Sequence, residues 1–417
     1  MLTKKNNYLP FVMWFFPLIF FAYQFILRLW PGLMMHQIME QFSIDASQFG
    51  IIAACYYYGY SGMQIPVACL LERFSPKYIV FIFAALCGVA TLFFTYSHGW
   101  YVACFSRFLV GAGSAVGFLG ISKVVSQWFP FNKYTKMIGL SFTVGLMGAI
   151  YGGKPISVFI ELYHWKSVAV MLAVVSIVIG CSTLMVLRSP QRSNGSSDES
   201  FKLSYFKVLL SSPIMWLLAC SNLLMVGSLE GFSDVWGVPY LMLAYSISKN
   251  EAAGLISFVF FGMLFGGPLL ALLSKKLGNY VLIASCGFGM AFAFVLLLTT
   301  TIYHWWALAS LFFSIGIMCC YQVIVFSAGS ELVKPQYLGV TIAFLNCINM
   351  LGGSFFHTSI GRVMDVFWLG SLNHGGIKQY GIIAYHWALM IIPACACLGA
   401  IIICLIGLRL RGRTQTD

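Results

Sequence analysis

Charged side chains are scarce in this chain of 417 residues. Only 9% of the residues are Asp, Glu, Lys or Arg, whereas 60% are hydrophobic. No segment is polar and long enough to form a separate domain outside a membrane. Neither a glycine-rich phosphate-binding loop nor a cluster of metal ligands is visible. We therefore expect no enzyme activity, no metal and no other cofactor.

Cysteine is present, but its distribution argues against a disulfide framework. All 13 cysteines fall inside predicted helices, for example Cys55, Cys87 and Cys395. None falls in a loop predicted to lie on the outer side of a membrane. We expect them to act as small apolar packing residues.

Long hydrophobic stretches dominate the chain instead. A membrane-spanning helix needs about 20 mostly apolar residues, and twelve stretches meet that requirement. Because the backbone must satisfy its own hydrogen bonds in lipid, these spans are predicted helices. The first is longer than a signal-peptide core, so we expect no cleavable signal. The predicted spans are 11–35, 46–71, 78–97, 100–127, 134–160, 167–187, 212–244, 252–273, 280–300, 304–330, 337–364 and 384–408.

The net charge of +12 follows the predicted topology and does not indicate nucleic-acid binding. If the N-terminus is cytoplasmic, sixteen basic residues fall on inner loops and tails and three on outer loops. Both termini are then predicted to be cytoplasmic. We expect the protein to lie in the plasma (inner) membrane of the cell. The inner residues are Lys4, Lys5, Arg73, Lys77, Lys133, Lys136, Arg188, Arg192, Lys202, Lys207, Lys275, Lys276, Lys334, Arg409, Arg411 and Arg413, and the outer ones are Lys166, Lys249 and Lys378.

A polar segment rich in Ser and Gly divides the chain into two halves that resemble each other. Residues 188–211 have the composition of a flexible linker between an N-terminal bundle, 1–187, and a C-terminal bundle, 212–417. At an offset of 202, the segment 66–78 aligns with 268–280. At an offset of 200, Gly139, Gly152 and Gly153 match Gly339, Gly352 and Gly353. Repeated halves with a site at their interface are typical of secondary transporters.

Several motifs of the chain resemble those of the major facilitator superfamily. Residues 68–77 are similar to the loop signature between its second and third helices, with Glu72 and Arg73 as the acid–base pair. Three positions depart from the pattern, because Ala68 and Ser75 stand where the family prefers Gly and Glu72 where it prefers Asp. The helix-four signature is matched by Arg107, Gly111, Gly113, Gly117 and Trp128-Phe129-Pro130, and the flexible helix five by Gly145, Gly148, Gly152 and Pro155.

A finer resemblance points to one branch of that family. Residues 56–60 and 63–66, together with Glu331, Gly339 and Asn346, look like a bacterial branch related to the lysosomal dipeptide transporters. Sugar-phosphate permeases share much of the pattern in the first two helices. The resemblance implies twelve helices in two pseudo-symmetric six-helix bundles around a central cavity.

Charged residues inside the membrane carry the functional prediction, because each one is costly there. Spans three, six, nine and twelve contain none beyond their ends, and in the family fold these helices stand outside. The resemblance therefore implies that the charged helices line a polar cavity. The ionisable residues within spans are Arg28, Arg107, Lys123, Lys154, Glu230, Asp234, His357 and Arg362.

Arg28 and Glu230 occupy equivalent positions of the repeat, at an offset of 202. We expect them to face each other, holding the two ends of a zwitterionic solute or pairing to close an outer gate. An anionic solute would use Arg28 as a bidentate clamp. The alternative is a structural ion pair.

Further candidates follow from polar groups on the inner helices. We expect solute contacts from Tyr23, Gln24, Tyr57, Tyr58, Gln64, Lys154, Tyr321, Gln322, Asn346 and Asn349. Proton coupling is assigned to Glu230, with Asp234 and His357 behind it. Gating or structural roles are assigned to Glu72, Arg73, Arg107, Lys123 and Glu331, with an inner-loop salt bridge for Glu331.

The sequence thus predicts an all-α membrane protein that acts as a monomeric secondary transporter, a symporter working by alternating access. We expect a small polar or charged solute, dipeptide- or amino-acid-like, moved together with protons. An organic-anion or sugar-phosphate permease is the alternative within this class. A ligand sensor that keeps the fold but transports nothing is the alternative from another class.

Overall fold

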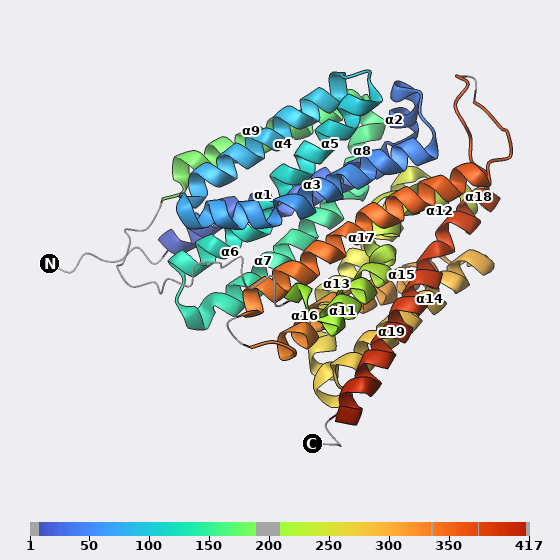
Figure 1. Ribbon diagram of the computed structural model, residues 1–417. Helices are drawn as coiled ribbons and strands as arrows, with labels where there is room; N and C mark the ends of the chain where they lie inside the picture. Colours follow the sequence, from blue (N-terminus) through green and yellow to red (C-terminus); the bar gives the residue numbers. More distant parts are fainter. Residues whose placement is uncertain (1–7, 189–208, 335–336, 374, 414–417) are drawn as a thin grey trace.

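The computed structural model describes residues 8–188, 209–334, 337–373 and 375–413. These residues are almost entirely helical, and the helices run roughly parallel or antiparallel to one another in two bundles (Figure 1). The first described residues of α1 and the last of α19 lie toward the same end of the molecule. We call this the inner end and the opposite one the outer end.

The N-terminal bundle contains the helices before residue 189. Two of its long rods are interrupted, between α5 and α6 and between α7 and α8. Its members are α1 (Leu9–Leu33), α2 (Met35–Phe42), α3 (Ala46–Arg73), α4 (Pro76–Tyr96), α5 (Trp100–Ser114), α6 (Val116–Trp128), α7 (Phe131–Gly152), α8 (Lys154–Leu162) and α9 (Trp165–Val186).

The C-terminal bundle repeats this arrangement with one conspicuous change of helix type. Its first rod passes from an α-helix through a 3₁₀ turn into a π-helix and back. Its members are α11 (Pro213–Met225), η1 (Val226–Ser228), η2 (Leu229–Trp236), α12 (Gly237–Tyr245), α13 (Lys249–Leu277), α14 (Asn279–Thr299), α15 (Trp305–Cys319), α16 (Tyr321–Glu331), α17 (Leu338–Val366), α18 (Ile382–Leu389) and α19 (Ile391–Arg413).

The twelve predicted spans match this architecture, and the fold class is confirmed. Within the described residues, eleven helical rods are long and apolar enough to cross a membrane. The twelfth is α3, which is 28 residues long but less hydrophobic because its middle carries Tyr56, Tyr57, Tyr58 and Gln64. The predicted linker, 188–211, lies almost entirely outside the described residues. All thirteen cysteines are free.

The two bundles meet mainly along α3 and α17, which cross the molecule side by side (Figure 1). Close backbone approach is possible because Gly50 has no side chain, and a Cβ there would overlap the carbonyl oxygen of His357. Ser354 donates to the Ala54 carbonyl at 3.1 Å, and the Ser61 hydroxyl donates to the Cys347 carbonyl at 2.9 Å. These contacts run from the outer end of α3 to its middle, so the outer side is closed.

Candidate functional site

A buried charge cluster lies where α1, α3 and η2 meet between the bundles. The Arg28 guanidinium forms ion pairs with both acids of η2: Nη1 lies 3.1 Å from Glu230 Oε2, and Nε lies 2.9 Å from Asp234 Oδ2. The Tyr57 hydroxyl, from α3, hydrogen-bonds to Glu230 Oε2 at 2.6 Å and also to Asp234 Oδ2. All four side chains are buried. The cluster therefore links the N-terminal bundle, through Arg28, to the C-terminal bundle, through Glu230 and Asp234, by buried ion pairs.

The π-helical turn aims both acids at one partner. Glu230 and Asp234 are four residues apart, and η2 spans both of them. The Ser233 hydroxyl donates to the Ser228 carbonyl five residues back, which follows the i→i+5 pattern of a π-helix. Such turns are rare and occur frequently at functional sites. The sequence indicated the two acids but not this local geometry.

The cluster has unequal numbers of positive and negative groups. Arg28 is the single cation among the four side chains, while Glu230 and Asp234 are two acids. With both acids ionised the cluster carries one net negative charge in a site closed to water, which is costly. The Phe25 ring, 4.9 Å from the guanidinium carbon of Arg28, covers the cation on one side. One added proton makes the cluster neutral.

His357 lies beside the cluster, on α17, without joining its hydrogen bonds. Its ring is fully buried and sits 5.3 Å, centroid to centroid, from the Tyr57 ring. Neither ring nitrogen has a hydrogen-bond partner among the described residues. His357, predicted to couple protons, thus packs on the Tyr57 ring and makes no hydrogen bond to Glu230 or Asp234. Its role in proton coupling stays a prediction.

Arg107 fixes the helix that carries Arg28. Pro31 lies inside α1 and has no N–H, so the carbonyl of Leu27, four residues back, lacks its helical donor. Arg107 Nη1 donates to that carbonyl at 2.9 Å from α5. The guanidinium also lies over the rings of Trp30 and Tyr56, at 5.8 and 5.0 Å. Arg107 therefore supplies the hydrogen bond that the carbonyl of Leu27, the residue before Arg28, lacks within the helix.

A second group of predicted residues forms a polar patch in the C-terminal bundle. Tyr321 donates to the Asn222 carbonyl at 3.0 Å, and Asn349 Nδ2 donates to Gln322 Oε1 at 3.4 Å. One amide atom each of Asn222, Gln322 and Asn349 is buried without a partner among the described residues. Asn346, three residues before Asn349 on α17, is partly buried. These amides have free hydrogen-bonding capacity to offer a solute.

The structure places five predicted contacts of the N-terminal bundle in different surroundings. The structure does not bring Tyr23 into the charge cluster, because its hydroxyl donates to the Leu172 carbonyl on α9, and its solute contact stays a prediction. Tyr58 is likewise outside the cluster, with a side chain that is 48% exposed, and its solute contact stays a prediction. Gln24 and Gln64 are buried, and Gln24 Oε1 accepts from Tyr56 at 3.3 Å. Lys154 is exposed, and its aliphatic part approaches Gly254 of α13.

The residues predicted to gate the inner end show fewer contacts. Glu72 and Arg73 end α3 and are exposed, with no ion pair between them in the described part of the chain. Lys123 is partly exposed. Glu331 Oε1 accepts from the side-chain amide of Asn279 at 2.8 Å, and no salt bridge of Glu331 is found among the described residues, so its predicted salt bridge stays a prediction.

A second ionic cluster, which the sequence did not reveal, holds the outer ends together. Lys378 Nζ lies 2.9 Å from Asp365 Oδ1 and 3.3 Å from Asp45 Oδ2, so it bridges α17 to the start of α3. Asp365 Oδ2 also accepts from the Ser47 N–H at 2.9 Å, and Tyr380 donates to Asp365 Oδ1. We call Asp45, Ser47, Asp365, Lys378 and Tyr380 the outer latch.

Lys378 and Tyr380 of the outer latch lie outside the membrane spans, and the charges of the latch stabilise one another. Burial lowers the pKa of Lys378, but the hydrogen bond and charge of Asp365, with the charge of Asp45, outweigh burial and raise it above 10.5. Burial and the hydrogen bond to Asp365 raise the pKa of Tyr380 above its usual value of 10.0. Lys378 is therefore charged at every physiological pH.

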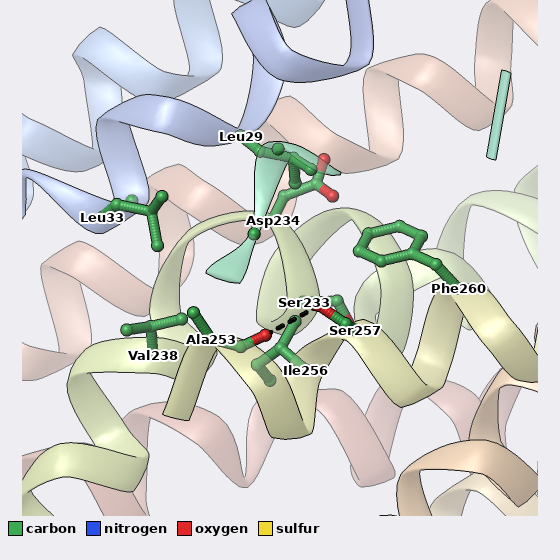
Figure 2. Close-up of a pocket in the computed structure, with 12 residues that line it drawn as sticks. Leu29, Leu33, Ser233, Asp234, Val238, Ala253, Ile256, Ser257 and Phe260 are labelled. Carbon is green, nitrogen blue, oxygen red and sulfur yellow. Dashed lines mark hydrogen bonds between the residues drawn. The ribbon is translucent and has the colours of Figure 1, made fainter. Parts of the chain in front are cut away.

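A small cavity marks the second seam between the bundles, where α1, α7, η2, α12 and α13 meet (Figure 2). Its volume of about 20 Å³ is room for about one water molecule. Gly153 allows the approach, because a Cβ there would lie 2.8 Å from Ser257 Oγ. Figure 2 shows Ser257 hydrogen-bonded to the Ala253 carbonyl, 2.9 Å away, while Leu29 and Val238 supply apolar walls. The space along this seam is therefore too small for a solute.

Comparison with known proteins places these features in context. The family model described as the Major Facilitator Superfamily matches residues 13–357. An uncharacterized transporter, YybO, of Bacillus subtilis is 25% identical over 36% of the chain and 32% of its own length. A probable sulfoacetate transporter, SauU, of Cupriavidus necator is 22% identical over 34% of the chain and 33% of its own length. The chain thus spans about a third of these two relatives.

A solved structure extends the likeness to nearly the whole chain. The fold matches a bacterial homologue of the human lysosomal transporter Spinster, in an inward-facing and occupied conformation, with a TM-score of 0.75. The match covers 97% of this chain and 98% of that structure, at 17% sequence identity. Identity this low establishes the fold alone.

Proposed function

Since the chain belongs to the major facilitator superfamily and is a membrane transporter, not an enzyme, we propose that it moves a small carboxylate-bearing solute together with protons. Its two bundles alternate access to a site between them. The observation that carries the proposal is the cluster of one buried cation and two buried acids, drawn from both bundles. A merely structural ion pair would need neither the second acid nor a π-helical turn to aim it.

Charge arithmetic links the proton to the solute. Arg28, Glu230 and Asp234 together carry one net negative charge when both acids are ionised. One proton makes the cluster neutral and weakens the hold on Arg28, which frees the guanidinium for a carboxylate. The remaining acid, still ionised, is then the partner for an ammonium group. The carboxylate of a zwitterion thereby pairs with Arg28 and its ammonium group pairs with the ionised acid, while the other acid holds one proton.

An organic anion fits the same site with a different stoichiometry. It brings no cation, so Glu230 and Asp234 both need protons once Arg28 has turned to the solute. The similarity to a probable sulfoacetate transporter supports this second candidate. A zwitterionic solute is preferred because it satisfies both signs of charge with one proton. The number of protons moved per solute distinguishes the two.

The polar patch supplies the uncharged contacts of the proposed site. Asn222, Gln322 and Asn349 each keep a buried amide atom without a partner among the described residues. Amide groups of a peptide-like solute are matched donors and acceptors for them. We assign the patch to the body of the solute and the charge cluster to its ends.

The outer latch is assigned as the gate that seals the outer side. Its contacts connect α3 to α17 and to the segment that follows α17, so they must break when the outer side opens. We further propose that the chain acts as a monomer in the plasma membrane with both termini in the cytoplasm. The predicted excess of inner basic residues supports that orientation.

The experiment is uptake into vesicles reconstituted with the purified full-length chain. Dipeptides, amino acids, sulfoacetate and sugar phosphates are tested with and without a pH gradient. We expect saturable, gradient-driven uptake of one class, at least tenfold reduced in Arg28→Ala and Glu230→Gln. Arg362→Ala, which removes an exposed arginine of α17, is the matched control and retains uptake.

Two results would reject the proposal. Full activity in both Arg28→Ala and Glu230→Gln would reduce the cluster to a structural pair. Specific binding of a solute without flux, under any gradient, would favour a ligand sensor with the transporter fold.

A further inference from the structure

An apolar groove opens on the lipid-facing side of the C-terminal bundle, near its inner end. It lies between α11 and α19 and has a volume of about 170 Å³. Ile214 and Leu217 line one wall, and Ile402, Leu405 and Ile406 line the other. The one charged residue among those that line it is Arg409. The groove is thus an apolar slot with a cation at its mouth.

The corresponding corner of the N-terminal bundle is filled. There the start of α1 and the end of α9 close over Met13, Val124 and Leu187, all buried, with Leu9 packed against them. The backbone N–H of Arg188 lies 3.2 Å from the Met13 sulfur and completes the closure. The groove is therefore not an unavoidable product of the repeated architecture. It distinguishes one half from the other.

The chemistry of the groove fits one kind of occupant. An apolar slot that faces lipid favours an acyl chain over water. Arg409 is exposed, and within the described residues no carboxylate forms an ion pair with it. Arginine binds phosphate through paired N–H donors, and a basic side chain at the membrane surface is attracted to anionic lipid headgroups.

We propose that this groove binds one anionic phospholipid of the leaflet at the inner end. Its acyl chain lies between α11 and α19, and its phosphate pairs with Arg409. Because α11 continues into η1 and η2, the lipid contacts the same rod that carries Glu230 and Asp234. The proposal does not depend on which solute is transported.

Thermal unfolding of the purified full-length protein in detergent tests the site. Phosphatidylglycerol, phosphatidylcholine with the same acyl chains, and inorganic phosphate are titrated separately. We expect phosphatidylglycerol to raise the unfolding temperature most, because a ligand of the folded state stabilises it. In Arg409→Ala the half-maximal concentration should rise about fivefold, and the preference over phosphatidylcholine should disappear.

Two further variants keep the test decisive. Leu405→Trp, at a side chain that is 60% exposed, should obstruct the groove and weaken the effects of both lipids. Arg188→Ala removes the cation of the filled corner and should behave like the unchanged protein. An equal loss in Arg188→Ala would reduce the effect to general surface charge, and an equal response to inorganic phosphate would exclude a lipid tail in the groove. Either result would overturn the proposal.

Discussion

The contact between Arg107 and the Leu27 carbonyl makes a prediction that can be measured as a coupling free energy. Pro31 deprives that carbonyl of its helical N–H, and Arg107 Nη1 replaces the missing donor at 2.9 Å. In Arg107→Met the carbonyl is left buried and unpaired. In Pro31→Ala the helix itself supplies a donor, so the loss of Arg107 should matter less.

The expected magnitude follows from the buried carbonyl. An unsatisfied buried acceptor costs about 1–3 kcal/mol, and removing a buried cation also recovers part of its desolvation penalty. The absolute effect of Arg107→Met combines both, whereas the double-mutant cycle with Pro31→Ala isolates the first. We expect the two changes to couple by about 1–3 kcal/mol in the free energy of unfolding.

Reversible unfolding in mixed micelles of detergent and dodecyl sulfate measures this coupling. Pro17→Ala is the matched control, since Pro17 lies inside the same helix but away from the carbonyl that Arg107 reaches. Its cycle with Arg107→Met should be additive. Additivity within about 0.5 kcal/mol in the Pro31 cycle would refute the assignment of Arg107 as the donor that replaces the missing N–H.

Three further predictions concern the gate and the buried histidine. Asp365→Asn should weaken the outer latch by about 1 kcal/mol, so hydrogen exchange of residues 46–57 should quicken about fivefold; unchanged exchange would exclude a gating role. Because the pKa of Lys378 is raised above 10.5, its contribution is complete below that value and is lost only as the pH rises through the raised one. A loss of protection of the latch amides between pH 7 and 9, beyond the ordinary rise of intrinsic exchange with pH, would contradict this. His357→Leu removes two buried nitrogens without partners and should raise stability by about 1–2 kcal/mol while impairing coupling; a stable variant with normal coupling would remove His357 from the mechanism.

The fold could be predicted because the membrane imposes strong rules on sequence. Apolar length defined the spans, including α3, whose polar middle lowers its hydropathy. The structure also brings together Arg28 and Glu230, which the repeat offset had singled out, because equivalent residues of two matched halves face a common interface. Asp234 joined them through its spacing of four residues on the same rod.

Other features depend on contacts that spacing does not encode. Tyr23 lies five positions before Arg28, about 140° away around an α-helix, so it meets α9 instead of the cluster. The outer latch brings Asp45 to Asp365 and Lys378, which lie more than 300 residues later in the sequence, and none of the three stands out at a helix end or in a loop. The donor role of Arg107 required knowledge of which carbonyl Pro31 leaves free.

Counting protons per solute tests the central claim most directly. Vesicles with a trapped pH indicator report proton movement while labelled solute reports uptake, in the unchanged protein and in Asp234→Asn, Glu230→Gln and the exposed-acid control Glu251→Gln. We predict one proton per zwitterion in the unchanged protein and in Glu251→Gln. The two cluster variants should still exchange solute but fail to accumulate it. Accumulation that ignores the pH gradient, or that survives loss of both acids, would contradict the account.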